Sequence, residues 1–266
     1  MNDPILGTRY LVTATTGGNP ALEPLEGSSH SLGFMYSSQL VPNLQVGATY
    51  WSVTEQNAIS GFSAQFVVAN EGVFPGRVVR DATGRITTVD ATRVNFGSID
   101  VTGVDYQLNY LYPSSIGDWS TSLNATQVLT YDTALTPSSP IVDGNGKARD
   151  SGLWSPTWKF AASLNWKTEN FSTTAIARYV SEYQDYSSTR RIGDTWFFDT
   201  NFRVELGKAI VSDNQFVAGT FVELGAVNVF DELPEFSNFG GGFYGYDPAQ
   251  ADIQGRFVYL RVGTKL

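Results

Sequence analysis

Alternation of apolar and polar residues with a period of two is the feature that most constrains the fold of this chain. In the segment 158–166, one face carries Trp158, Phe160, Leu164 and Trp166, and the other carries Lys159, Ser163 and Asn165. Similar alternation recurs in segments 31–40, 44–58, 103–110, 119–131, 171–186, 196–206, 215–230 and 258–266. No stretch sustains the i, i+3, i+4, i+7 spacing of an amphipathic helix. The pattern predicts an all-β protein with about nine antiparallel strands, each long enough to span a bilayer when tilted.

Aromatic residues stand where the apolar faces begin and end. They include Trp119, Tyr131, Trp158, Trp166, Phe171, Tyr183 and Trp196. Amphipathic rings at both ends of an apolar band are typical of a membrane interface. A soluble β-sandwich or solenoid is the alternative, since half-buried antiparallel strands are common in such folds. Strand length and the aromatic ends together favour a transmembrane β-barrel.

The predicted connections alternate between short and long. Tight turns rich in Pro, Gly, Asn, Asp and Ser are expected at 41–43, 113–118, 168–170 and 211–214. Long loops are expected near 1–28, 60–97, 136–154 and 232–255, with a shorter one near 187–194. A hairpin over 78–88 is predicted inside the longest loop. Short turns at one end and long loops at the other are the plan of an outer-membrane barrel.

Composition excludes several functional classes. The chain has 17 Lys and Arg against 26 Asp and Glu, which gives a net charge of -9 and argues against a nucleic-acid partner. The absence of Cys removes thiolate metal sites and Cys nucleophiles. The single histidine, His30, leaves no His cluster for a metal and is interpreted as a polar residue at the barrel rim. We therefore expect no catalytic residue, no metal and no cofactor, and predict that the protein is not an enzyme.

Four short motifs resemble the C-terminal barrel portion of TonB-dependent outer-membrane receptors. The segment 18–24, GNPALEP, is similar to a loop of the family that precedes a barrel strand, although Leu25 separates Pro24 from Glu26. The others are the pair of segments 95–97 and 103–105, the run 228–234 (NVFDELP), and Gly255-Arg256 at the start of the last strand. The motif positions are Asn19, Pro20, Gly103, Asp105, Asn228, Phe230, Asp231, Gly255 and Arg256.

The resemblance implies a location in the outer membrane of a Gram-negative bacterium and a role in active import. Residues 1–28 are expected to form an extracellular loop, and residues 29–266 the strands and loops of part of a barrel of about 22 strands. The implied partners are outer-membrane lipid, a small-molecule ligand, and a plug domain and TonB reached through an N-terminal part of a longer receptor. Siderophores, cobalamin and carbohydrates are the implied ligand classes. A passive porin and, more remotely, an outer-membrane enzyme are the alternatives.

The sequence departs from the family in two ways, and the second leads us to interpret the chain as a fragment. It ends on Leu266, where the family usually has an aromatic residue. No signal peptide, TonB box or plug domain is recognised in the sequence. A sheet of about nine strands would leave two open edges in hydrocarbon, where each unsatisfied backbone group costs several kcal/mol. Alone, the chain is therefore expected neither to close nor to transport.

Candidate binding residues fall in the last long loop. Its aromatic residues, Phe236, Phe239, Phe243, Tyr244 and Tyr246, stand among glycines and can stack on a ligand or pack on one another. Asp231 and Glu232 suggest a strand-exit turn, with ligand or Ca²⁺ binding as the alternative. Charged residues on the polar strand faces predict either a hydrated network inside the barrel or ordinary wall residues: Arg178, Asp199, Arg203, Glu205, Glu223, Arg261 and Lys265.

Overall fold

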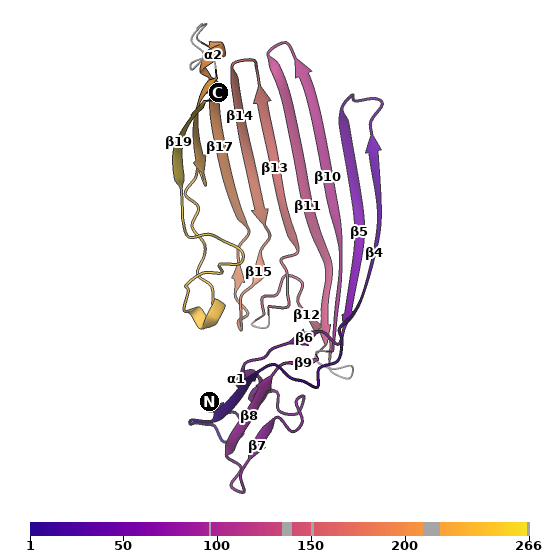
Figure 1. Ribbon diagram of the computed structural model, residues 1–266, viewed down its shortest axis with the longest axis vertical. Helices are drawn as coiled ribbons and strands as arrows, with labels where there is room; N and C mark the ends of the chain where they lie inside the picture. Colours follow the sequence, from indigo (N-terminus) through magenta and orange to yellow (C-terminus); the bar gives the residue numbers. More distant parts are fainter. Residues whose placement is uncertain (96, 135–139, 150–151, 210–218, 265–266) are drawn as a thin grey trace. The chain divides into compact units, whose positions relative to one another are not determined.

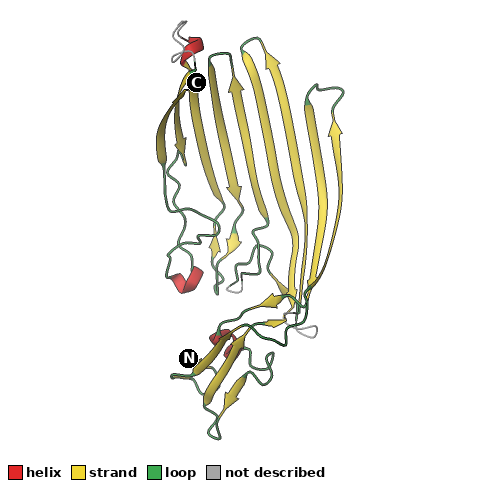
Figure 2. Ribbon diagram, in the orientation of Figure 1, coloured by secondary structure: helices red, strands yellow, loops and turns green. Residues whose placement is uncertain are grey.

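The computed structural model describes residues 1–95, 97–134, 140–149, 152–209 and 219–264, and most of its strands belong to one sheet (Figures 1 and 2). From one edge to the other, the order is β19-β18-β17-β14-β13-β11-β10-β5-β4, and β12 pairs with β11. The bounds are β4 Glu26–Ser37, β5 Leu44–Gln56, β10 Ser98–Ser114, β11 Gly117–Ala134, β12 Val142–Asp143, β13 Trp158–Lys167, β14 Phe171–Val180, β17 Thr195–Glu205, β18 Thr220–Val227 and β19 Phe257–Thr264. Successive long strands are neighbours, which confirms the predicted meander.

The chain divides into two compact units. The sheet unit contains Ser31–Trp51, Thr102–Leu129 and Asn145–Leu266. The loop unit contains Met1–His30, Ser52–Val101 and Thr130–Gly144. Among the described residues of both units, no helix has the length and apolar character needed to cross a membrane.

Strand register separates an apolar face from a polar face in the sheet unit. Phe160 pairs with Tyr179, which pairs with Trp196, so these three rings share one side of the sheet. The other members of this face continue the apolar set: Trp119, Leu123, Leu164, Phe198, Phe202, Leu224, Leu260 and Val262. The opposite face carries Lys159, Ser163, Asn165, Arg178, Asp199, Arg203, Glu223 and Arg261. The two faces predicted from the alternation are therefore confirmed.

Several predicted boundaries were wrong. The strand expected over 171–186 ends at Val180, and Tyr183–Gln184 forms β15, which pairs with β16 at Arg191–Ile192. Tyr183 is only 4% exposed, because it packs in a cluster of loop residues rather than at the end of a strand. The strand beginning at Trp196 gives way at Leu206 to a short helix, α2 (Leu206–Ala209). The turn expected at 211–214, the first residues of the strand expected over 215–230, and Lys265 lie outside the described residues.

The loop unit has its own small hydrophobic core. The predicted hairpin is confirmed, because β7 (Val78–Arg80) pairs antiparallel with β8 (Ile86–Thr92). Helix α1 (Ala64–Ala69) begins at Ser63, whose hydroxyl accepts the N–H of Phe66, and buries Val67 and Val68 against β8. Strands β6 (Ile59–Ser60) and β9 (Val94–Asn95) pair antiparallel and join the two ends of the segment between β5 and β10. The predicted long connection is thus largely folded.

The N-terminal segment belongs to the same core rather than forming an irregular loop. It contains β1 (Asn2–Asp3), β2 (Thr8–Arg9) and β3 (Thr13–Gly17), and β3 pairs in parallel with β8. Arg80 donates to Asp3 at 2.9 Å and to Glu71 at 2.8 Å, and the hydroxyl of Tyr10 also donates to Asp3. The hydrogen bond from Arg80 holds the pKa of Asp3 well below its usual range. An ionised, buried Asp3 therefore ties the N-terminal segment to the hairpin.

Candidate functional site

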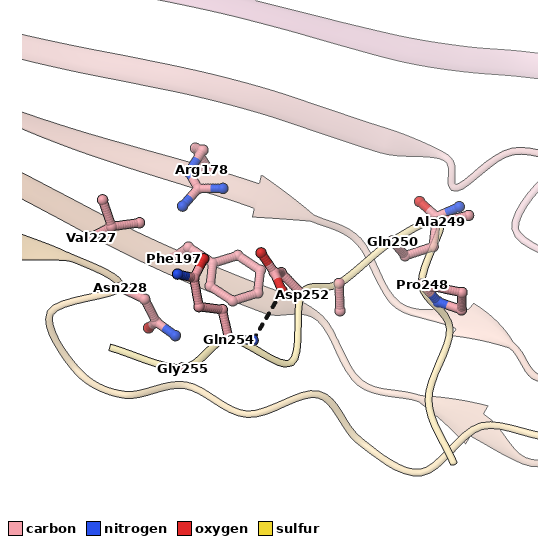
Figure 3. Close-up of a pocket in the computed structure, with 11 residues that line it drawn as sticks. Arg178, Phe197, Val227, Asn228, Pro248, Ala249, Gln250, Asp252, Gln254 and Gly255 are labelled. Carbon is pink, nitrogen blue, oxygen red and sulfur yellow. Dashed lines mark hydrogen bonds between the residues drawn. The ribbon is translucent and has the colours of Figure 1, made fainter. Parts of the chain in front are cut away.

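A hollow of about 330 Å³ lies where the last long loop runs along the polar face of the sheet unit (Figure 3). The sheet supplies Arg178 from β14, Phe197 from β17, Val227 from β18 and the following Asn228. The loop supplies residues 248–252, Gln254 and Gly255. The hollow is thus formed by residues from several parts of the chain, at the ends of the strands that lead into long loops.

An ion pair fixes the sheet side of the hollow. Arg178 Nε and Nη2 donate to the two carboxylate oxygens of Asp199, each at 3.0 Å. The guanidinium also lies 5.2 Å from the centre of the Phe197 ring. Bidentate geometry and ring contact both restrict the arginine. Its charge is therefore largely engaged within the wall, rather than projecting freely into the hollow.

Asn228 joins this ion pair to the strand-exit turn. Its backbone N–H donates to Asp199 Oδ1 at 2.8 Å. Its side chain accepts the N–H of Glu232 and donates to the Glu232 carbonyl oxygen, at 2.9 and 2.8 Å. Asn228 and Asp231 both have positive φ, at 53° and 59°, a conformation that Asn and Asp tolerate better than most residues. The oxygen and the nitrogen of the Asn228 side-chain amide are therefore both used to hold the turn.

A second hydrogen bond joins the two ends of the last long loop. Asp231 Oδ1 accepts the backbone N–H of Arg256 at 2.8 Å, and Arg256 Nη1 donates to the Val229 carbonyl oxygen at 3.3 Å. Gly255 adopts φ of +68°, and a Cβ there would lie 2.9 Å from Asp231 Oδ1. The NVFDELP run and the Gly255-Arg256 pair therefore meet and close the base of this loop.

Polar groups also line the loop side of the hollow. Asp252 Oδ1 accepts the backbone N–H of Gln254 at 2.9 Å. The backbone N–H of Gln250 donates to the Asp247 carbonyl oxygen at 3.2 Å. Gln250 Oε1 is buried and has no hydrogen-bond partner in the described part of the chain. Because an unsatisfied buried acceptor is unfavourable, a hydrogen-bond donor that reached this oxygen would stabilise the loop.

Buried carboxylates hold the rest of the loop in place. Asp185 accepts hydrogen bonds from the Ser237 hydroxyl, the Asn238 backbone N–H and Arg190, at 2.8 to 3.1 Å. Burial alone raises the pKa of Asp185, but these hydrogen bonds outweigh it, so the pKa lies below its usual value. Asp247 accepts from the hydroxyls of Tyr183 and Tyr186 at 3.3 and 3.2 Å. Burial, followed by the charge of Asp247, raises the pKa of Tyr183 well above its usual value.

The five aromatic residues proposed from the sequence do not form a single stack. Phe239 packs edge-on against Tyr186 at 5.3 Å and lies 5.5 Å from Tyr244, whose ring contacts Phe243 at 5.3 Å. Phe236 lies beneath the guanidinium of Arg190, and Tyr246 is half-buried. Phe243 is 86% exposed and Tyr244 is 55% exposed. The described contacts of Phe239 are packing contacts, whereas Phe243 and Tyr244 present open ring surface.

The remaining motif residues also have local structural partners. Asn19, just before Pro20, accepts the N–H of Ala21 and donates to the Arg93 carbonyl oxygen. Asp105 accepts the hydroxyl of Thr126 at 2.7 Å. A Cβ at Gly103 would overlap the Trp51 ring, which explains the glycine. Phe230 packs edge-on against Phe198, an apolar-face residue, at 5.3 Å.

The loop residues of the hollow were missed by the sequence analysis. Gln250, Asp252 and Gln254 are ordinary polar loop residues, and neither their spacing nor their chemistry marks them. The carboxylate-to-backbone bond of Asp231 was likewise not predicted, although the expected strand-exit turn is present there. Among the described residues, no group of three or more His, Asp or Glu side chains is arranged to hold a metal ion.

The two-faced sheet of long strands, joined alternately by short turns and long loops, has the architecture of part of the wall of a transmembrane β-barrel of the outer-membrane type. A family model described as "TonB dependent receptor-like, beta-barrel" matches residues 3–229. The chain therefore belongs to the TonB-dependent receptors, a family of outer-membrane proteins of Gram-negative bacteria that are transporters rather than enzymes. No curated protein matches the chain.

Solved structures of receptors share the fold. The ferric enterobactin receptor PfeA of Pseudomonas aeruginosa, in complex with BCV-L6, is 17% identical, with a TM-score of 0.62 over 94% of this chain and 32% of the receptor. The FrpB iron transporter of Neisseria meningitidis is 14% identical, with a TM-score of 0.58 over 93% of this chain and 31% of that one. The siderophore receptor PirA of Acinetobacter baumannii is also 14% identical, with a TM-score of 0.58 over 92% and 32%. The chain thus spans about a third of the length of these receptors.

Proposed function

We propose that this chain forms part of the wall and ligand-selecting loops of an active outer-membrane importer of ferric siderophores. The observation that carries the proposal is the separation of a polar from an apolar face across β11, β13, β14, β17, β18 and β19. The apolar face suits lipid and the polar face suits a hydrated interior. In this proposal the wall acts together with a plug domain and with TonB, as in the receptors that the sequence motifs resemble.

The iron-related neighbours support siderophores over the other two ligand classes. One similar structure is that of a ferric enterobactin receptor in complex with enterobactin, one is that of an iron transporter and one is that of a siderophore receptor. Cobalamin and carbohydrate-type ligands are the competing classes. Within the proposal, the exposed rings of Phe243 and Tyr244 and the buried acceptor of Gln250 serve as ligand contacts.

A direct test measures uptake in the bacterium that encodes the chain. A strain lacking the gene and the same strain carrying the native gene are supplied with ⁵⁵Fe-siderophores, ⁵⁷Co-cobalamin or labelled maltodextrins. Gene-dependent uptake of an iron chelate supports the proposal. Gene-dependent uptake of cobalamin or maltodextrin alone reassigns the ligand.

The passive-porin alternative is separated from active import by the energy requirement. The same uptake is repeated after deletion of tonB and after collapse of the proton gradient across the inner membrane. Active import through TonB is lost under both conditions. Uptake that persists, with linear dependence on external ligand concentration, supports the porin instead.

The hollow is tested by a pair of glutamine variants. Gln250→Ala removes the buried acceptor, so it is expected to raise the half-saturating ligand concentration without changing the amount of receptor in the membrane. Gln39→Ala is the control, because Gln39 lies in the turn between β4 and β5, at the strand ends that carry short turns. Equal uptake curves for both variants would remove Gln250 from the ligand site.

A further inference from the structure

An uncharged groove lies on the polar face of the sheet unit. It has a volume of about 520 Å³ and runs across β5, β10, β11 and β13, which are neighbours in the sheet (Figure 1). Among the described residues that line it, none is charged. Asn43 of the lining belongs to the turn between β4 and β5, so the groove lies at the strand ends that carry short turns. Its amide and hydroxyl side chains are those of Asn43, Gln45, Asn109, Ser120, Ser122 and Ser163.

Strand register and side-chain contacts place these groups on the polar face. Ser122 of β11 pairs with Ser163 of β13, and their hydroxyl oxygens lie 2.8 Å apart. Asp105 of β10 accepts the hydroxyl of Thr126, so it shares the face of Thr126 and Ser122. Asn109 lies on the same face as Asp105, because alternate residues of a strand point to the same side. The groove therefore belongs to the face that suits a hydrated interior.

The polar face has a different character on the last three strands. Arg203 and Glu205 of β17 form an ion pair at 2.7 Å, and Arg261 of β19 lies 3.5 Å from Glu223 of β18. The hydroxyl of Tyr259 also donates to Glu223, at 3.1 Å. The Arg261 side chain remains 62% exposed, so its charge acts on whatever lies beside this wall. The polar face thus combines an uncharged groove over β5, β10, β11 and β13 with a charged wall over β17, β18 and β19.

The two surfaces differ in how strongly they hold a molecule. Amide side chains and hydroxyls both donate and accept hydrogen bonds, so they replace water around a polar molecule without attracting one sign of charge. Passage through a protein requires contacts that are favourable enough for entry and weak enough for release. Charged side chains retain groups of opposite charge more strongly. The groove therefore suits passage, and the charged wall suits attachment.

We propose that the imported ligand moves along the uncharged groove, and not along the charged wall, on its way to the periplasm. The inference rests on the proposed function, in which the polar face lines a barrel filled by a plug. Passage then requires space between the plug and one part of the wall. A plug separates more readily from a surface without charged groups, because no attraction between charges has to be overcome there. Short turns lie on the periplasmic side of such barrels, so the groove lies at the exit.

A pair of tryptophan variants of the full-length receptor tests the path. Ser120 of β11 and Asn201 of β17 are linked through successive pairs on β13 and β14, so they lie in one row across the polar face. Uptake of ⁵⁵Fe-siderophores, ⁵⁷Co-cobalamin and labelled maltodextrins is measured at equal amounts of receptor in the membrane. Ser120→Trp narrows the groove and is expected to lower the maximal uptake rate several-fold, with ligand binding to cells that lack tonB unchanged. Asn201→Trp is the control and is expected to leave both unchanged.

A second measurement avoids a bulky side chain. The chain has no Cys, so Ser120→Cys and Asn201→Cys each introduce a single thiol into it, in a receptor without other cysteines. The rate of labelling by a fluorescent maleimide is measured in cells during uptake of the same labelled compounds. Labelling of the Ser120→Cys variant is expected to become several-fold faster during uptake, and only in cells that contain TonB. Labelling of the Asn201→Cys variant is expected to stay constant.

The two measurements define what would overturn the path. Native uptake in Ser120→Trp overturns it, as does an equal loss of uptake in Ser120→Trp and Asn201→Trp. Faster labelling of the Asn201→Cys variant during uptake also overturns it. Uptake of cobalamin or maltodextrin that Ser120→Trp slows and Asn201→Trp does not would reassign the ligand but support the path. The path and the proposed siderophore ligand therefore fail separately.

Discussion

Asp231 and Arg256 lie 25 residues apart in the sequence, yet Asp231 Oδ1 accepts the backbone N–H of Arg256 at 2.8 Å. The bond joins the exit of β18 to the approach of β19, so it closes the base of the last long loop. This loop also supplies one side of the polar hollow. The run 228–234 and the pair Gly255-Arg256, which the sequence suggested only as family resemblances, therefore contact each other and close the base of the same loop.

Replacing Asp231 by Ala is expected to loosen this closure. The substitution removes the acceptor for the Arg256 N–H and places Ala at a φ of 59°, so we expect a loss of about 1–2 kcal/mol in the free energy of unfolding. Urea titration of the receptor folded in lipid vesicles measures the change. Asp231→Asn is the control, because Asn keeps an acceptor oxygen and tolerates positive φ. If both variants lose the same stability, the hydrogen bond is not the cause.

Neighbouring residues on β13 test the assignment of the two faces. Leu164 is 47% exposed on the apolar face, whereas Ser163 lies on the polar face. Leu164→Arg is expected to cost about 2–4 kcal/mol if the site is near the middle of the bilayer. Ser163→Arg is expected to cost less, because its side chain enters a hydrated interior. Folding into lipid vesicles measures both variants, and equal losses would contradict the assignment.

Acid is expected to open the last loop through Asp185. Its pKa is lower in the folded protein, so its stabilising contribution is fully present above the unfolded pKa of about 4 and is lost as the pH falls through the folded pKa. The protection factors of the amides in residues 232–255, which are corrected for the intrinsic pH dependence of hydrogen exchange, should therefore fall below about pH 4. Asp185→Asn should expose the loop already at neutral pH. Asp252→Asn should not, because Asp252 is exposed and Asn keeps an acceptor oxygen for the backbone N–H of Gln254. Protection factors that stay constant through this pH range in the native chain would argue against this role.

The loop unit is expected to depend on the charge of Arg80. The guanidinium satisfies Asp3, whose side chain has no exposed surface, and also pairs with Glu71. Arg80→Ala leaves these carboxylates without their cation, and proteolysis of segments 1–28 and 60–97 in intact cells should become roughly tenfold faster or more. Arg9→Ala, at an exposed position, is the matched control. Equal rates of cleavage of both variants would show that the ion pairs of Arg80 do not stabilise the loop unit.

The candidate binding residues show which features of the site local sequence patterns can predict and which they cannot. The aromatic loop was identified from composition, but Phe239 turns inward because Tyr186 offers it a packing surface. Gln250, Asp252 and Gln254 were not identified, because a polar loop residue gains its role only from the strands that it meets. Tyr183 was assigned to a strand end, whereas burial against Trp154 and Ala148 draws it into the loop cluster.

The sequence by itself determined the long strands and their two faces, and its motifs indicated the family of the chain. These properties are local, since side chains alternate across a strand and turn residues set the backbone between strands. Only the tertiary structure decided that segments 1–28 and 60–97 share a core, that β3 pairs in parallel with β8, and that Asp231 meets Arg256. Each of these depends on contacts between residues far apart in the chain. No period or motif within one segment encodes such a partner, because the partner is selected by packing and by the need to satisfy buried polar groups.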